Sequence, residues 1–164
     1  RHPQHCGFSR KGTIVSVCSK VNKSTSILKD ALRILSISEV SESKLKSSLQ
    51  KKGYKQEDIL DVLDYLREKR FIDDIRFCTI LIKKHINKEK GINYIRQLLS
   101  LHGIPENTIT GILAKTYPQS LEYKVAKNFL KSLKLPFPKA ILKLKTRGFS
   151  EETIEKLTEE FSSE

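Results

Sequence analysis

The 164-residue sequence contains no methionine and no tryptophan, and only three cysteines, seven glycines and five prolines. An odd, small set of cysteines excludes the disulfide framework of a small secreted protein, so we expect a reducing, cytoplasmic compartment. So few glycines and prolines argue against a β-sandwich with many turns, and no apolar run approaches the roughly 20 residues of a membrane-spanning helix. Because methionine is missing even at position 1, we expect the natural start of the chain to lie upstream. The abundant Leu, Ile, Lys and Glu favour an all-α fold.

Charge is unevenly distributed along the chain. In total, 31 Lys and Arg residues stand against 19 Asp and Glu residues, a formal net charge of +12. Residues 1–26 carry five basic residues and no acid, 27–74 are neutral, 75–149 carry fifteen basic residues against three acids, and 150–164 sum to −5. A concentrated positive field attracts phosphates, whereas a scattered surplus only raises solubility. We therefore expect a polyanionic partner, with a solvated lysine-rich surface as the simpler alternative.

Three glycines anchor an internal repeat: Gly53, Gly103 and Gly148, separated by 50 and 45 residues. A large apolar residue follows each glycine, and apolar residues recur eight and four positions before it and six and nine positions after it. These columns are Tyr54, Ile104 and Phe149; Leu45, Ile95 and Ala140; Leu49, Leu99 and Leu144; Ile59, Ile109 and Ile154; and Val62, Ile112 and Leu157. Residues four apart share a helix face, and glycine readily takes the left-handed conformation that ends a helix. The pattern predicts a helix, a glycine corner and a second helix, three times over.

The second helix of each pair has its own start signals. Glu57, Glu106 and the pair Glu151 and Glu152 suit a helix N-terminus, and Ser150 can cap one. Further helices are predicted at 27–37, 74–88 and 121–134, the last closed by Pro136 and Pro138. We therefore predict an all-α fold of three tandem three-helix repeats, 27–74, 75–117 and 118–164, stacked into an elongated, curved array. Residues 1–26 are expected to form a mobile basic arm, with at most one short strand at Ile14, Val15 and Val17.

One phrase of the sequence resembles a known family. Residues 71–77 read Phe-Ile-Asp-Asp-Ile-Arg-Phe and are followed by Gly91, Ile95, Leu99, Gly103 and Ile104. With Ala31-Leu32-Arg33-Ile34-Leu35, and with Gly148-Phe149-Ser150 and Ile154, this resembles the RecX family of recombination regulators over residues 27–161, although Cys78 replaces the usual Ala. The resemblance implies a cytoplasmic, non-enzymatic protein of three tandem three-helix repeats. It also implies binding to the RecA recombinase and its filament on DNA, with modulation, usually inhibition, of its activity.

Two predicted helices place basic residues opposite an apolar face. Segment 121–134 opposes four lysines to Leu121, Val125, Ala126, Phe129, Leu130 and Leu133, and segment 75–88 opposes Arg76, Lys83 and Asn87 to Phe77, Cys78, Leu81, Ile82 and Ile86. Such rows can track phosphates without reading base sequence, whereas an ordinary solvated face is the alternative. The candidate DNA- or RecA-binding residues are Arg76, Lys83, Lys84, Lys90, Arg96, Lys124, Lys127, Lys131, Lys134, Lys143 and Arg147.

Sequence-specific DNA reading is disfavoured. A helix-turn-helix would insert the last helix of a repeat into the major groove, but segments 57–70 and 151–161 are acidic and would be repelled by phosphate. Tyr94 and Tyr117 lie beside basic residues and could stack on unpaired bases, but we favour positions in the core or at its rim.

No metal site, cofactor or catalytic centre is predicted. His2, His5, Cys6 and Cys18 are zinc-type donors in a spacing that fits no standard site. Asp73 and Asp74 are better explained as a helix start than as an acid–base pair, and Cys78 as a buried thiol. His85 and His102 are expected at the surface or at its boundary with the core. The sequence has no phosphate loop, nucleophile elbow or metalloprotease motif.

Three functional hypotheses follow. The first is a monomeric regulator that lies in the groove of a RecA–DNA filament and obstructs it, with its lysines facing the DNA phosphate backbone or acidic protein patches. The second is a non-specific nucleic-acid-binding module without a recombinase partner. The third is a protein–protein scaffold in which the lysines carry no affinity.

Overall fold

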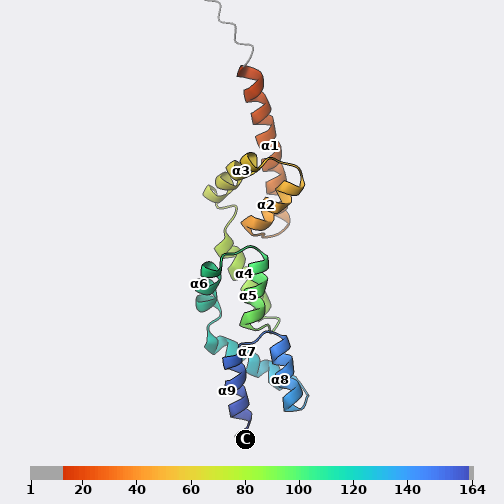
Figure 1. Cartoon of the computed structure of the whole chain (residues 1–164), viewed down its shortest axis with the longest axis vertical. Coiled ribbons are helices and arrows are strands. Elements are labelled where there is room, and N and C mark those ends of the chain that lie inside the picture. The colour runs from red at the N-terminus through yellow and green to blue at the C-terminus, as the bar shows by residue number, and fades with distance from the viewer. Residues whose placement is uncertain (1–12, 163–164) are drawn as a thin grey trace, which may run out of the picture. The chain divides into compact units, whose positions relative to one another are not determined.

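The computed structural model describes the backbone of residues 13–162 and the side chains of residues 25–161. Over this range the chain is all-α, with nine helices and no strand, as predicted (Figure 1). The helices are α1 (Thr13–Ile37), α2 (Glu42–Lys51), α3 (Gln56–Glu68), α4 (Asp74–Ile86), α5 (Ile92–Leu101), α6 (Glu106–Thr116), α7 (Gln119–Ser132), α8 (Phe137–Thr146) and α9 (Glu151–Ser162).

The prediction for the N-terminal arm was wrong from residue 13 onward. Helix α1 includes residues 13–26, for which we expected an irregular arm with at most a short strand. The segment has no glycine or proline, and Ile14, Val17 and Val21 recur three and four positions apart, which is the spacing of a helix face. Residues 1–12 lie outside the described part of the chain.

The helices form two compact units. The first comprises the chain up to Glu39 together with Leu45–Phe71, and the second comprises Val40–Lys44 together with the chain from Ile72 onward. The predicted division into three repeats, and their stacking into a curved array, stay predictions.

In the first unit, α3 packs on α1. The hydroxyl of Tyr54 donates a hydrogen bond of 2.9 Å to Asp30, and the Lys52 ammonium lies 2.8 Å from the same carboxylate. Lys52, and then Tyr54, lower the pKa of Asp30. The buried residues of this unit are Ile27, Ala31, Leu45, Leu49, Ile59, Val62, Leu63 and Leu66.

The second unit contains two hydrophobic clusters. Helices α4, α5 and α6 enclose the first cluster, and α7, α8 and α9 enclose the second. Buried residues of the first are Phe77, Cys78, Ile82, Ile95, Leu99, Ile104, Ile109, Ile112, Leu113 and Tyr117. Those of the second are Ala126, Phe129, Leu130, Ala140, Leu144, Phe149, Ile154 and Leu157.

The three predicted glycine corners share one geometry. The φ angles of Gly53, Gly103 and Gly148 are +83°, +76° and +76°. In each corner the N–H of the next residue donates to the carbonyl of the residue four positions before the glycine, at 3.4, 3.2 and 3.2 Å. Apart from the half-buried Tyr54, every apolar residue of the matched columns is buried. This part of the sequence prediction is confirmed.

Two carboxylates cap helices from outside their own helix. Asp74, at the start of α4, accepts a hydrogen bond of 2.9 Å from the N–H of Glu42, the first residue of α2. Glu122, in the first turn of α7, accepts one of 2.9 Å from the N–H of Ile92, the first residue of α5. Each carboxylate therefore accepts a hydrogen bond from the first N–H of another helix, where the N–H groups have no intrahelical partners.

Candidate polyanion-binding surface

Helix α7 presents a row of lysines opposite its buried face, as the helical wheel predicted. Ala126, Phe129 and Leu130 are buried, while Lys124 and Lys131 on α7, and Lys134 just beyond its end, are exposed. The row borders a shallow hollow of about 590 Å³ that Tyr123, Lys124, Lys127 and Lys156 help to line.

Lys127 differs from the other lysines of the row because α9 neutralises it. Its ammonium pairs with the carboxylate of Glu160, which also accepts a hydrogen bond from the hydroxyl of Tyr123. The bond from Lys127, then that from Tyr123, lowers the pKa of Glu160, and the charge of Lys131 adds to the effect. The pKa of Tyr123 is raised, chiefly by its bond to Glu160. The acidic C-terminal helix therefore weakens the positive field of the row.

A second group of cations surrounds the turn between α4 and α5. Burial lowers the pKa of His85, and the charges of Lys88, Lys84 and Lys90 lower it further. Three ammonium groups therefore act on a single half-buried ring. We call Lys84, Lys88 and Lys90 the basic turn. Lys88 is not among the binding residues predicted from the sequence, although its position just after α4, among other lysines, could have indicated it.

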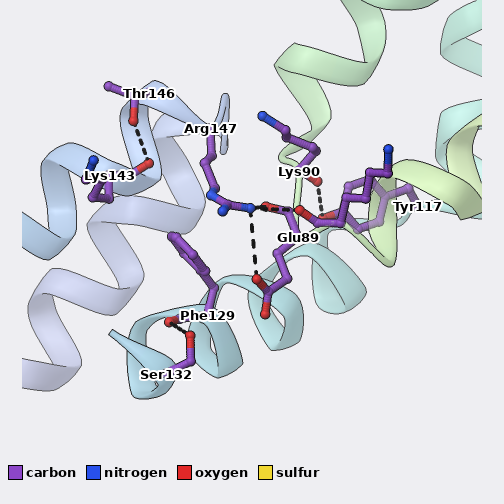
Figure 2. A network of polar contacts seen from close by, with 9 residues as sticks. Glu89, Lys90, Tyr117, Phe129, Ser132, Lys143, Thr146 and Arg147 are labelled. Atoms are coloured by element: carbon purple, nitrogen blue, oxygen red, sulfur yellow. Dashed lines mark hydrogen bonds and ion pairs between the residues drawn. The ribbon is translucent and has the colours of Figure 1, made fainter. Parts of the chain in front are cut away.

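Arg147 joins the end of α8 to the basic turn. Its Nη1 donates to the carbonyl oxygens of Lys88 and Glu89, at 2.7 and 3.3 Å, and its guanidinium lies 4.2 Å from the centre of the Phe129 ring. Figure 2 shows the side chain reaching across to Glu89 with the Phe129 ring beside it. These contacts make Arg147 primarily a structural link between the two hydrophobic clusters of the unit.

Glycine permits close packing at the same junction. The Gly91 N–H donates to the carbonyl of Arg147 at 3.0 Å, and a Cβ atom on Gly91 would lie 2.1 Å from the nitrogen of Phe149. Only a residue without a side chain fits between these two backbone segments.

Glu122 is the residue that sequence reasoning most clearly missed. It is 1% exposed and accepts hydrogen bonds from the N–H of Ile92 and from the N–H and hydroxyl of Ser150, the latter two at 3.0 and 2.6 Å. A fourth bond of 3.0 Å comes from the Thr153 hydroxyl. The helical wheel could have indicated it, because Glu122 precedes Ala126 and Phe129 by four and seven positions on the apolar face.

The remaining candidates are spread over the unit. Arg96 pairs with Glu106 and donates to Thr110 at 3.1 Å, so its charge is committed within the fold. Arg76 lies in the first turn of α4, whereas Lys83 lies in its last turn. Lys83 and Lys143 are exposed. The structure therefore places Lys84 and Lys90 near His85, where both lower its pKa, and it places Arg147 on the carbonyl groups of Lys88 and Glu89.

The predictions for the neighbouring polar residues are confirmed. The Asp73 carboxylate accepts hydrogen bonds of 3.0 Å from the N–H groups of Ile75 and Arg76, and the Ser150 hydroxyl accepts one of 3.3 Å from the Thr153 N–H. Both are helix caps. Burial raises the pKa of the Cys78 thiol to about 11, which keeps it protonated.

Both tyrosines occupy the core or rim positions that we favoured. Tyr117 is fully buried, donates to the Lys90 carbonyl at 3.0 Å and has a raised pKa because of burial. Tyr94 is half-buried beneath the Lys90 ammonium. His85 and His102 are also half-buried, in agreement with the boundary positions expected for them.

Among the residues whose side chains are described, no three His, Cys, Asp or Glu residues lie close enough to hold a metal ion. The zinc-type donors His2, His5, Cys6 and Cys18 lie outside that range. None of the helices described has the length and apolar character needed to cross a bilayer.

The chain is similar to known proteins in both sequence and fold. No protein-family model matches the chain. The chain is 30% identical over 131 residues to the regulatory protein RecX of Vibrio vulnificus, covering 76% of this chain and 85% of that protein. It is 29% identical over 127 residues to the regulatory protein RecX of Streptococcus pyogenes serotype M3, covering 73% of this chain but only 49% of that relative. The crystal structure of RecX from Lactobacillus salivarius has the same fold, with a TM-score of 0.79 at 19% identity over 88% of this chain and 99% of that one.

The part of the chain that the structure describes is all-helical, and the curated relatives are named regulatory proteins. The chain belongs to the RecX family. It spans most of the Vibrio relative and about half the length of the Streptococcus relative.

Proposed function

We propose that this chain binds the RecA recombinase and its filament on DNA, and that it reduces recombinase activity by occupying the filament groove. The single observation that carries the proposal is the set of exposed lysines in the second unit of a RecX-family chain. A groove occupied in this way is closed to a second DNA and to the adjoining subunit contacts. In this proposal the predicted repeats 27–74, 75–117 and 118–164 contact successive parts of the filament, and the protein acts as a cytoplasmic monomer.

Electrostatics favours the two groups of lysines as contact points. The basic turn and the α7 row contain six lysines besides Lys127, and Glu89 and Glu160 are the acids that pair beside them through Arg147 and Lys127. Contacts of this kind act on the phosphate backbone or on acidic protein patches and do not depend on base sequence. The proposal therefore predicts little preference among DNA sequences.

The direct test is RecA-dependent ATP hydrolysis on single-stranded DNA, with the chain added at less than one copy per RecA subunit. The proposal predicts a progressive fall in the hydrolysis rate and shorter filaments in electron micrographs. An unchanged rate together with unchanged filament length would discard it. Heat-denatured chain at the same concentration controls for non-specific effects of a cationic polypeptide.

The clustering of Lys84, Lys88 and Lys90 around His85 favours a second candidate, a non-specific nucleic-acid-binding module. This candidate predicts salt-sensitive binding to bare DNA with no measurable affinity for RecA. A pull-down against RecA, with and without DNA and nucleotide, separates it from the first. A third candidate is a protein–protein scaffold in which the lysines carry no affinity. It predicts that partner affinity is unaltered when Gln replaces Lys124, Lys127, Lys131 and Lys134.

A further inference from the structure

A hollow of about 350 Å³ lies beside the basic turn, between α5 and the corner that joins α8 to α9. Its polar lining comes from Asn93 and Gln97 of α5, from Lys145 and Thr146 of α8 and from Glu151 of α9. Tyr94 adds an aromatic ring, and Ile154 adds an apolar surface. This volume is near the lower end of the roughly 300–1,000 Å³ typical of small-molecule sites.

The walls of the hollow are fixed to one another by the backbone. The Asn93 N–H donates to the carbonyl of Gly148 at 2.9 Å. A Cβ atom on Gly148 would lie 2.6 Å from the nitrogen of Tyr94, so the two segments are in close contact. The hollow therefore exists before any molecule enters it, and binding there does not require the walls to be ordered first.

The lining selects a neutral planar group rather than a phosphate. Glu151 and Lys145 bring opposite charges to the lining, so the hollow has no net positive charge to hold a phosphate, and the Glu151 carboxylate can accept a hydrogen bond from a base N–H. The amides of Asn93 and Gln97 carry both donors and acceptors, as the edge of a nucleobase requires. The Tyr94 ring, with the Lys90 ammonium over it, adds an aromatic surface to this lining.

The cations needed for the flanking phosphates lie at the edge of the hollow. The Lys90 ammonium is 4.3 Å from the centre of the Tyr94 ring, and the His85 ring is 5.4 Å from the same centre. Besides burial, the charges of Lys88 and Lys84 lower the pKa of His85. Lys90 of the basic turn therefore lies against the aromatic side of the hollow, and His85 lies beside the same ring.

From this juxtaposition we infer that the hollow binds one unpaired base of a single-stranded nucleic acid, with the flanking phosphates on Lys84, Lys88 and Lys90. The inference rests on the part of the proposed function in which the second unit contacts nucleic acid. A base within a duplex is stacked and paired, so it cannot enter the hollow without being extruded.

The test compares two fluorescent single strands of equal length and charge, one of thymidines and one of abasic sites, by anisotropy with the full chain. The thymidine strand is expected to bind about two- to tenfold more tightly, the range of one hydrogen bond to the base. Equal affinity for the two strands, or no binding to either, would overturn the inference.

Variants assign the preference to the hollow. Asn93 and Gln97 are exposed, so the double variant Asn93→Ala/Gln97→Ala is expected to fold, to lose most of the preference for bases and to keep its salt dependence. Asn128→Ala, an exposed amide on α7, is the matched control and should keep the preference. Full preference in the double variant would contradict the assignment.

A triple variant separates phosphate contact from base contact. Lys84→Gln/Lys88→Gln/Lys90→Gln should weaken both strands together and lower the slope of log affinity against log salt by about 2, because each single-strand phosphate contact contributes about 0.7. Unchanged affinity would remove the basic turn from the site. Base preference without affinity for RecA would contradict the filament proposal and support this inference. Affinity for RecA without base preference would contradict this inference and leave the filament proposal intact.

Discussion

Lys127 on α7 forms an ion pair with Glu160 on α9, within a row of lysines that the sequence alone presents as uniformly cationic. The acidic end of the chain is thus folded against part of the basic surface. The charge of Lys131 also lowers the pKa of Glu160. Neutralising the Glu160 carboxylate therefore changes the electrostatic field around both Lys127 and Lys131.

Removing that carboxylate should strengthen binding to polyanions. Glu160→Gln removes the carboxylate that pairs with Lys127 and is expected to raise affinity for single-stranded DNA about two- to fivefold at low salt, with a smaller gain at high salt. Glu155→Gln makes the same change in net charge at an exposed position on α9. Equal gains in the two variants, measured by anisotropy, would show that net charge matters and the ion pair does not.

The buried carboxylate of Glu122 should be essential for stability of the second unit. Glu122→Ala leaves donors of Ile92, Ser150 and Thr153 without their acceptor, and we expect the free energy of unfolding to fall by about 3 to 5 kcal/mol. Urea denaturation followed by circular dichroism measures the loss. Glu155→Ala is the exposed comparison and should change stability by less than about 0.5 kcal/mol. A similarly small effect at Glu122 would refute its role as a cap of two helices, α5 and α9.

Two glycine substitutions should change stability in opposite directions. Gly91→Ala places a methyl group against the backbone of Phe149 and is expected to cost about 3 kcal/mol. Gly111→Ala, in the middle of α6 with open space around the added Cβ, is expected to stabilise the chain by about 0.5 to 1 kcal/mol. Thermal unfolding of both variants checks the pair. Stabilisation by Gly91→Ala would show that the junction is looser than described.

His85 should make stability depend on pH in a defined direction. Its pKa is lowered in the folded chain, so the folded state binds fewer protons than the unfolded state just below the ordinary value of about 6.5. The contribution of His85 to stability is therefore present above that pH and is lost as pH falls through the folded pKa. His85→Gln should flatten this part of the stability profile between about pH 5 and 7.

The same histidine offers a readout of anion binding. Phosphates on the basic turn would offset the lysine charges, so single-stranded DNA should raise the pKa of His85, as followed by the imidazole proton signals in NMR. No change in its titration at saturating DNA would place the phosphates elsewhere.

Local patterns made much of the fold predictable. The glycine corners followed from apolar residues at fixed positions around Gly53, Gly103 and Gly148, because the signal lies within eighteen residues of chain. The start of α4 at Asp73 and the two faces of α7 were predictable for the same reason. The helical start of α1 was missed because three neighbouring apolar residues were interpreted as a strand.

The candidate site was less predictable because it depends on tertiary contacts. The charges of Lys127 and Arg147 are evident from the sequence, but their partners are not. Lys127 pairs with Glu160, and Arg147 donates to the carbonyl groups of Lys88 and Glu89. Those partners are distant in sequence, and no helical period relates them. The hollow beside Tyr94 has the same origin, since α5 and the α8–α9 corner meet only in the folded unit.

The central claim is that the cations of the second unit attach the chain to a RecA filament. The most direct measurement is the affinity of fluorescently labelled chain for preformed RecA filaments on single-stranded DNA, for the wild type and for Lys84→Gln/Lys88→Gln/Lys90→Gln. The matched control is Lys29→Gln/Lys51→Gln/Lys55→Gln, which removes the same charge from exposed positions in the first unit. The account predicts tight wild-type binding, about tenfold or greater weakening in the basic-turn variant and near-normal binding in the control. Equal affinity in all three proteins, or no binding to the filament at all, would contradict it.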